Sequence, residues 1–146
     1  MAANYGAHQV INGTFGELWI DSDYIGEVTG FQAKITYNKS DIYQCGEIMS
    51  GVKITSAKGA GTIKCNKINS RMINYYRLET KTGKFPVFTI ISKLADPDAM
   101  GSERVKLTGV QFDEMTLADW EANKPGEESV PFTFSGFKTI DRIDAK

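Results

Sequence analysis

Apolar and polar side chains alternate along much of this chain, and this two-residue period is typical of β-strands with one buried face. The clearest case lies within residues 24–37, where every second residue from Phe31 to Tyr37 is apolar and the intervening residues are polar or charged. The largely apolar residues 86–95 predict a strand that is buried on both faces or nearly so, and similar alternating patterns predict strands at residues 14–20, 103–112 and 129–143. Pro131 favours an edge position or a strand start for the last of these.

Residues 51–66 are predicted to form a central hairpin around which the other strands are organised. Val52 and Ile54 alternate with polar residues on the way out, and the alternation resumes at Thr62 on the way back. Between them, residues 59–61 (Gly-Ala-Gly) have the small size and backbone freedom that a turn requires.

Residues 38–50 are predicted to form an inter-strand loop that is longer than an ordinary hairpin loop. This stretch carries charges together with large apolar residues: Ile42, Tyr43, Ile48 and Met49. Two interpretations remain open. The segment is either an Ω-loop folded over its own core, or a loop that docks on another subunit.

Two helices complete the predicted fold. Ser70 is a suitable N-cap for a helix at residues 71–80, and the Thr116–Asp119 capping box predicts a second, short helix at residues 117–122, held to the sheet by Trp120. We therefore expect a mainly β fold, a two-sheet sandwich or partial barrel with one flanking helix and one short helix. It forms a single domain over residues 1–146, in which residues 1–13 are an extended N-terminal arm.

Composition narrows the possible classes of protein. The chain has 146 residues, of which 41% are hydrophobic, and its net charge of −1 points neither to nucleic acid nor to an anionic membrane. The two cysteines, Cys45 and Cys65, predict free thiols in a reducing compartment rather than a disulfide framework. With no signal-peptide pattern and no apolar stretch of membrane-spanning length, we expect a cytoplasmic, soluble protein.

The sequence offers little from which to build a catalytic or metal site. Its single histidine, His8, lies in the predicted arm, where it cannot be held rigidly beside a nucleophile. Residues 21–23 and 96–98 are acidic but lack the glycine and distal glutamate of a calcium loop, so we predict turns there. Residues 59–61 lack the Gly-Lys-Ser/Thr of a phosphate loop. We expect no enzyme activity, no metal and no cofactor.

A family resemblance extends over nearly the whole chain. It rests on the order and spacing of six segments: N-G-T-F-G-E-L-W-I-D at residues 12–21, G-F-Q-A-K at 30–34, G-A-G-T-I at 59–63, K-I-N-S at 67–70, G-V-Q-F-D-E at 109–114 and P-F-T-F-S-G-F at 131–137. In these segments the chain resembles phage tail tube proteins of the PBSX prophage type.

This resemblance implies a helix-flanked β-sandwich whose copies close into hexameric rings. The rings would stack into the inner tube of a contractile phage tail or a phage-tail-like bacteriocin, with sheath, baseplate and tape-measure proteins as partners. The tube would assemble in the bacterial cytoplasm and form a conduit for DNA, without specific binding, or for ions. The resemblance also implies that the loop at residues 38–50, through its four large apolar residues, contacts the adjacent ring.

The polar strand faces are candidates for the wall of the channel. The residues concerned are Gln32, Lys34, Thr36, Lys53, Thr55, Thr89, Lys106 and Thr108. So many lysines would hold DNA rather than let it slide, which implies either balancing acidic residues or a face that points outwards, towards a sheath. Two alternative functions also fit the sequence: a ring-forming tube protein of a type VI secretion-like system, and a small-molecule-binding β-barrel.

Overall fold

The computed structural model describes residues 5–76, 86–114 and 116–143, and it consists mainly of antiparallel strands, as expected. The strands are β1 (Gly16–Ile20), β2 (Asp23–Tyr24), β3 (Val28–Ile42), β4 (Gly51–Asn66), β5 (Phe88–Leu94), β6 (Glu103–Phe112), β7 (Glu127–Phe134) and β8 (Gly136–Asp141). The helices are η1 (Ala7–Gln9), η2 (Gly13–Phe15) and α1 (Arg71–Tyr76). All eight strands belong to one continuous sheet in the order β2-β1-β5-β6-β7-β4-β3, with β8 paired to β6.

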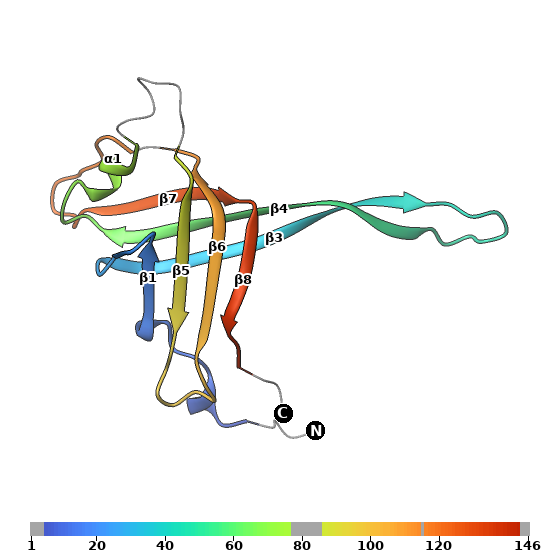
Figure 1. Ribbon diagram of the computed structural model, residues 1–146, viewed down its shortest axis with the longest axis horizontal. Helices are drawn as coiled ribbons and strands as arrows, with labels where there is room; N and C mark the ends of the chain where they lie inside the picture. The colour runs from blue at the N-terminus through green and yellow to red at the C-terminus, as the bar shows by residue number, and fades with distance from the viewer. Residues whose placement is uncertain (1–4, 77–85, 115, 144–146) are drawn as a thin grey trace.

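The sheet folds over into two layers whose strands run crosswise (Figure 1). Layer A contains β2, β1, β5, β8 and most of β6, and layer B contains β3, β4, β7 and the end of β6. The core lies between the layers and consists of Leu18, Ile20, Ile25, Ile63, Cys65, Met72, Phe88, Ile90, Leu107, Val110, Val130, Phe132 and Phe134. The two predicted sheets are therefore joined through β6.

The chain passes between the layers at a corner formed by Gly109 and Ser135. Gly109 has a φ of +67°, which favours glycine, and it is followed by the part of β6 that pairs with β7. Ser135 lies between β7 and β8, and its backbone N–H donates to the carbonyl of Thr108 at 3.1 Å. The single strand predicted at residues 129–143 is therefore wrong, because this corner divides it into two strands in different layers.

The predicted hairpin at residues 51–66 is also wrong. This segment is one continuous strand, β4, which is paired with β3 along its length. Gly59 and Gly61 lie where β4 crosses the aromatic core, opposite Phe134 and Phe132 of β7. A Cβ at Gly59 would lie 2.5 Å from the Phe134 ring, and one at Gly61 would lie 2.6 Å from Phe132 Cζ. These glycines allow close packing against aromatic rings rather than a turn.

The boundaries of the predicted long loop need the same kind of correction. Residues 38–42 continue β3 instead of starting a loop, so only residues 43–50 lie outside the two strands. The turn that sequence reasoning placed at residues 59–61 does not exist. The connection between two paired strands is instead at residues 43–50, and it joins strands of 15 and 16 residues.

Helix α1 begins at the predicted residue, and the predicted continuation through residues 77–80 lies outside the described residues. Its Met72 is buried in the core, and the Tyr75 ring packs edge-on against Phe88 with 5.3 Å between ring centroids. The side chain of Asn69, rather than that of Ser70, accepts a hydrogen bond from the first helical N–H, that of Arg71, at 3.0 Å.

The second helix, predicted at residues 117–122, does not form, and these residues are irregular or in a turn. Leu117 and Trp120 are exposed, the latter by 86%, so Trp120 does not hold the segment to the sheet. A helix this short is marginal without a buried face, and the capping residues alone cannot compensate for that loss.

The N-terminal segment is less extended than predicted, because η1 and η2 lie within or next to it. It is joined to the body through Asn12, whose backbone N–H donates to Asp96 Oδ2 at 2.8 Å. Asp96 is buried, and its other carboxylate oxygen accepts from the Asp98 N–H at 2.9 Å. The turn predicted at residues 96–98 is present and anchors the segment.

Candidate assembly surfaces

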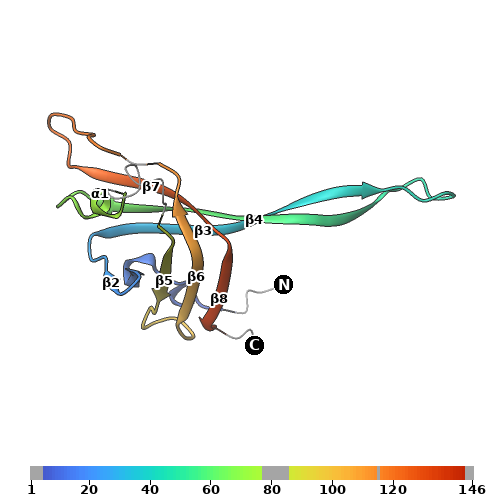
Figure 2. The ribbon, with the colours of Figure 1, turned by 45° about the horizontal axis from the view of Figure 1, so that its top comes forward.

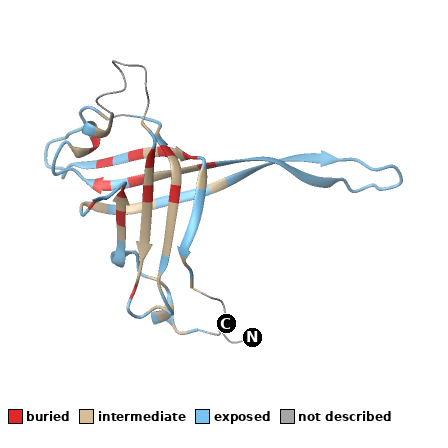
Figure 3. Ribbon diagram, viewed as in Figure 1, coloured by how far each residue is buried: buried red, intermediate tan, exposed pale blue. Residues whose placement is uncertain are grey.

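A two-stranded ribbon, residues 37–57, projects from the body of the molecule and is called the arm here (Figures 1 and 2). Pairing between β4 and β7 ends at Gly59 and Phe134, so within the described residues the part of β4 before Gly59 pairs with β3 alone. Every residue of the arm is exposed (Figure 3). The arm thus contributes nothing to the core of its own chain.

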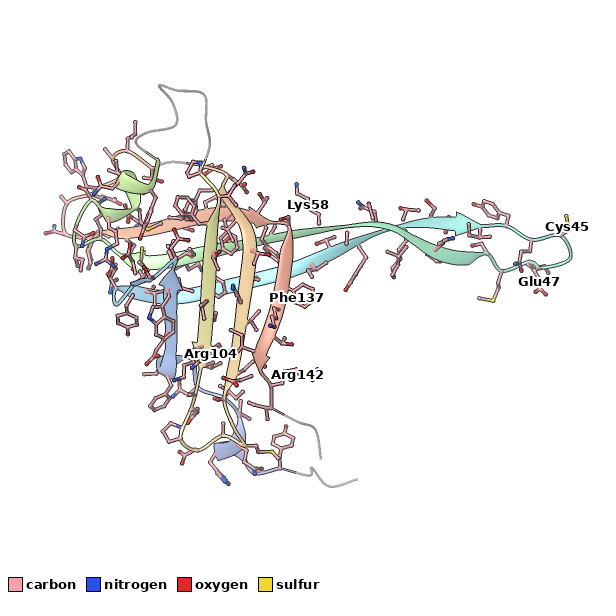
Figure 4. The ribbon with its side chains drawn as sticks, in the orientation of Figure 1. Cys45, Glu47, Lys58, Arg104, Phe137 and Arg142 are labelled. Atoms are coloured by element: carbon pink, nitrogen blue, oxygen red, sulfur yellow. The ribbon has the colours of Figure 1, made fainter. Side chains whose placement is uncertain are left out.

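The arm nevertheless carries many large apolar side chains. The exposed ones are Tyr37, Ile42, Tyr43, Ile48, Met49, Val52 and Ile54. Ile48 and Met49 near the tip are 103% and 86% exposed. The Ω-loop interpretation is therefore wrong, because the tip lies far from the core (Figure 4). An apolar surface of this kind marks a contact with another molecule.

The arm is held in shape by the β3–β4 backbone ladder and by side-chain hydrogen bonds at one point along it. At a β-bulge, the side-chain amide of Asn38 donates to Ser56 Oγ at 2.8 Å, and Thr55 Oγ1 donates to the carbonyl of Asn38 at 3.2 Å. At the tip, Gly46 has a φ of +87°. An isolated two-stranded ribbon is at best marginally stable in water.

Two strand edges of layer B are open in the described part of the chain. β3 is the terminal strand of the sheet, and its edge away from β4 has no strand beside it. β6 pairs with β7 only through Gln111–Thr133 and Phe112–Phe132, so the first half of β7 is also open on that side. Exposed edges of this kind offer unpaired backbone groups to a neighbouring chain.

A hollow of ≈ 480 Å³ opens beside the β3 edge, between the two layers. Its lining includes Leu18 of β1, Leu94 of β5 and Phe31 of β3. The apolar core therefore reaches the surface next to an unpaired strand edge, and a chain that paired with β3 would also cover this opening.

The outward side of layer B is polar. Register and alternation place four cross-strand rows on it: Gln32–Thr62–Pro131, Lys34–Ala60–Thr133–Gln111, Thr36–Lys58 and Lys64–Ser129. The residues between these positions, such as Ile63, Val130 and Phe132, point into the core and are buried. We call this surface the polar face of layer B.

The structure divides the eight predicted channel residues into three groups. Gln32, Lys34 and Thr36 lie together on the polar face of layer B. Lys53 and Thr55 lie on the arm beyond it. Thr89, Lys106 and Thr108 are on layer A, on the side away from the core, because they alternate with the buried residues of β5 and β6. The eight residues therefore do not share one surface.

The outward side of layer A carries charges in cross-strand rows. One row is Glu17–Lys93–Arg104–Asp141, in which Arg104 Nε lies 3.6 Å from Asp141 Oδ2. In the next row, Lys106 and Lys138 are directly opposite each other. This surface combines carboxylates with basic residues and lies on the opposite side of the molecule from the polar face of layer B.

A buried polar cluster beside α1 was not found by sequence reasoning. Lys67 Nζ lies 2.7 Å from Glu128 Oε1, and Arg71 Nη1 lies 3.4 Å from Glu27 Oε2. Both carboxylates are mostly buried, with 7% of each side chain exposed. The two pairs join residues far apart in the sequence, and no local pattern indicates them.

Cys65 lies in this cluster, and its Sγ is 3.8 Å from Glu128 Oε2. Burial, followed by the negative charges of Glu128 and Glu27, raises the pKa of the Cys65 thiol to about 11 from an ordinary 9.0. The other cysteine, Cys45, is free and exposed at the tip of the arm (Figure 4).

We expect the free energy of unfolding to fall as the pH rises from about 9 to about 11. The folded protein holds Cys65 neutral, so its contribution is complete below the unfolded pKa of 9.0 and is lost as the pH rises through about 11. Urea denaturation midpoints across this pH range measure the effect. Cys65→Ala should flatten the decline, whereas Cys45→Ala should leave it unchanged. Equal slopes for the two variants would contradict the prediction.

The described residues contain no group of three or more His, Cys, Asp or Glu side chains arranged to hold a metal ion. Across the same residues, none of the helices has the length and apolar character required to cross a bilayer.

Comparison with known proteins gives consistent results. The family model described as "Phage tail tube protein" matches residues 3–141. Among curated proteins, the chain is 33% identical over 139 residues to the phage-like element PBSX protein XkdM of Bacillus subtilis (strain 168). This alignment covers 94% of the chain and 95% of XkdM.

Solved structures share the fold at low sequence identity. One is a chain of the PVC sheath–tube complex, an extracellular contractile injection system in its extended state, with a TM-score of 0.68, 11% identity, and coverage of 88% of this chain and 90% of that one. Another is a chain of the anti-feeding prophage tube-terminating cap, with a TM-score of 0.69, 11% identity, and coverage of 97% and 95%.

Proposed function

The chain belongs to the phage tail tube protein family, and we propose that it is the subunit whose hexameric rings stack into the inner tube of a contractile phage tail or phage-tail-like particle. The observation that carries this proposal is the unpartnered apolar arm beside two open strand edges. Each of these features offers a surface that another copy of the chain would cover.

Ring closure would use the two open edges of layer B. The edge of β3 in one subunit would pair with the open part of β7 in the next, so that layer B continues from subunit to subunit. The two edges belong to different strands, so the interface is head-to-tail and closes by rotation. The neighbouring chain would also cover the hollow beside Phe31 and Leu94.

Stacking of rings would use the arm. Its apolar residues are exposed in the isolated chain and would be buried against the adjacent ring, with Ile42, Tyr43, Ile48 and Met49 as the anchors. Burial of such side chains contributes about 1.5–3 kcal/mol each in favourable cases. Because six arms would act together at each ring junction, these contributions accumulate.

The polar face of layer B would then line the central channel, through which DNA or ions pass, and layer A would face outwards. An outward layer A is the surface available to a sheath, and the ends of the tube would meet baseplate and tape-measure proteins. Support comes from the fold shared with a subunit of the PVC sheath–tube complex and with one from the anti-feeding prophage cap.

The double variant Tyr43→Ala with Met49→Ala is expected to shorten or abolish tubes without unfolding the subunit. Both side chains are exposed, so their removal costs the subunit little stability, whereas truncation of buried interface anchors typically costs about 2 kcal/mol each. Tube lengths are measured by negative-stain electron microscopy, and folding by circular dichroism. The polar tip variant Gln44→Ala with Glu47→Ala is the control. Normal tube lengths for the apolar double variant would contradict arm-mediated stacking.

A further inference from the structure

The polar face of layer B carries more lysines than carboxylates near the Lys34–Lys58 end, although the whole chain is almost neutral. The whole chain has a net charge of −1, yet Lys34, Lys58 and Lys64 are all exposed on this one face. Glu127 of β7 lies at the end of the face, diagonal to Lys64, and Asp119 and Glu121 line a pocket with Lys64 at the same end. The rows of Lys34 and Lys58, and the Asn38–Ser56 row next to them, contain no carboxylate.

Lys34 and Lys58 are close neighbours. Lys34 is opposite Ala60, two residues along β4 from Lys58, so the pair is diagonal across two strands. Such positions are separated by roughly 7–8 Å. Two like charges at this spacing repel each other, and among the described residues neither lysine makes a salt bridge. An anion placed between them removes this cost.

The remaining side chains on this face indicate which anion fits. They are mainly hydroxyls and amides: Gln32, Thr36, Thr62, Gln111, Ser129 and Thr133. Together with lysine, these are the side chains that contact phosphate and sugar in protein–DNA complexes. An acidic protein segment would also require apolar contacts, which this face offers only at Ala60 and Pro131. No aromatic ring is among these side chains, so unpaired bases have no stacking platform beside the Lys34–Lys58 pair; Trp120, which lines a pocket with Lys64, lies at the other end of the face.

We propose that this face binds the phosphate backbone of double-stranded DNA inside the channel, without reading its sequence, through the Lys34–Lys58 pair of each subunit. The inference rests on the proposed function, because it is the ring that brings the pairs of six subunits around one duplex. Binding is then electrostatic, and it weakens steeply as the salt concentration rises. The channel holds DNA at low salt and releases it at high salt.

A nuclease-protection experiment tests the proposal on assembled tubes. Tubes are formed in the presence of a labelled DNA duplex and treated with DNase, which digests DNA on the outside. Wild-type tubes should retain protected duplex, and increasing salt should release it. Lys34→Gln with Lys58→Gln should reduce the protected fraction by about tenfold or more.

The matched control is Lys106→Gln with Lys138→Gln, a neighbouring lysine pair on the outward side of layer A. This variant should protect as much DNA as the wild type. The proposal is overturned if wild-type tubes protect no duplex, if the Lys34–Lys58 variant protects as much as the wild type, or if poly-glutamate displaces the duplex at an equal concentration of charge.

Failure of tube formation is a separate result, visible by electron microscopy, and it would count against the proposed function itself. The polar face is exposed in the single subunit, so the same variants can then be compared on DNA-cellulose. Elution of the Lys34–Lys58 variant at lower salt than the Lys106–Lys138 variant would support binding by this face. Equal elution would overturn it.

Discussion

Replacement of Gly61 by alanine is expected to lower the free energy of unfolding by about 3 kcal/mol, a large part of the 5–15 kcal/mol typical of a domain. The added Cβ would overlap the backbone oxygen of Gln32 on the neighbouring strand and lie 2.6 Å from Phe132 Cζ. Phe132 is fully buried and stacks on Phe31, so neither ring can move without disturbing the core. Urea denaturation of the purified variant measures the loss.

Gly30→Ala is the matched control for this experiment. It makes the same chemical change in β3, the strand next to β4, but its Cβ would meet only the Lys64 side chain at an ordinary 3.7 Å. We expect its denaturation midpoint to remain close to that of the wild type. If the two variants have equal midpoints, Gly61 is not required for close packing against Phe132.

Sequence reasoning identified most strands because their buried faces impose a two-residue period. The bounds of β6 were predicted at both ends, and the alternation in β3 correctly placed Gln32, Lys34 and Thr36 on one side. The same period fails in the part of β3 that has no core beneath it. Residues 38–42 are in a strand whose two faces are both exposed, so they show no alternation and were predicted as a loop.

The errors at Gly59, Gly61 and Trp120 have a different origin. Glycine is favoured both in turns and where another group approaches the backbone closely, and only the position of the Phe132 and Phe134 rings distinguishes these cases. A capping box likewise signals a helix start but supplies no surface for Trp120 to bury. The local sequence shows which conformations a residue favours. Contacts with residues far away in the sequence decide which of these conformations forms.

The candidate assembly surfaces were predictable in part. The large apolar residues at 42–49 drew attention to the tip, and the structure confirms that they have no partner within the described chain. The eight residues predicted to line the channel lie on three different surfaces of the structure. Alternation in the sequence shows which face of its strand a residue is on, but it does not show to which layer the strand belongs. The open edges of β3 and β7 depend on strand order, which the sequence does not reveal.

Removal of most of the arm is expected to abolish tube assembly while leaving a folded, monomeric subunit. In this variant residues 39–55 are replaced by Asn-Gly, a two-residue turn that suits the flanking Asn38–Ser56 pair. Every residue removed is exposed, so the core retains all of its contacts and the melting temperature should change by only a few degrees. Electron microscopy and light scattering measure assembly, and circular dichroism measures folding.

This truncation distinguishes the two interfaces that the proposed function requires. The open edge of β3 from residue 28 to 38, the open part of β7 and the hollow between the layers all remain, so ring closure retains its main surfaces while stacking loses its anchors. Single rings at high protein concentration, without tubes, would therefore fit the assignment of the arm to stacking. Tubes of normal length would contradict it. A truncated chain that does not fold would show instead that the arm stabilises its own subunit, contrary to its complete exposure.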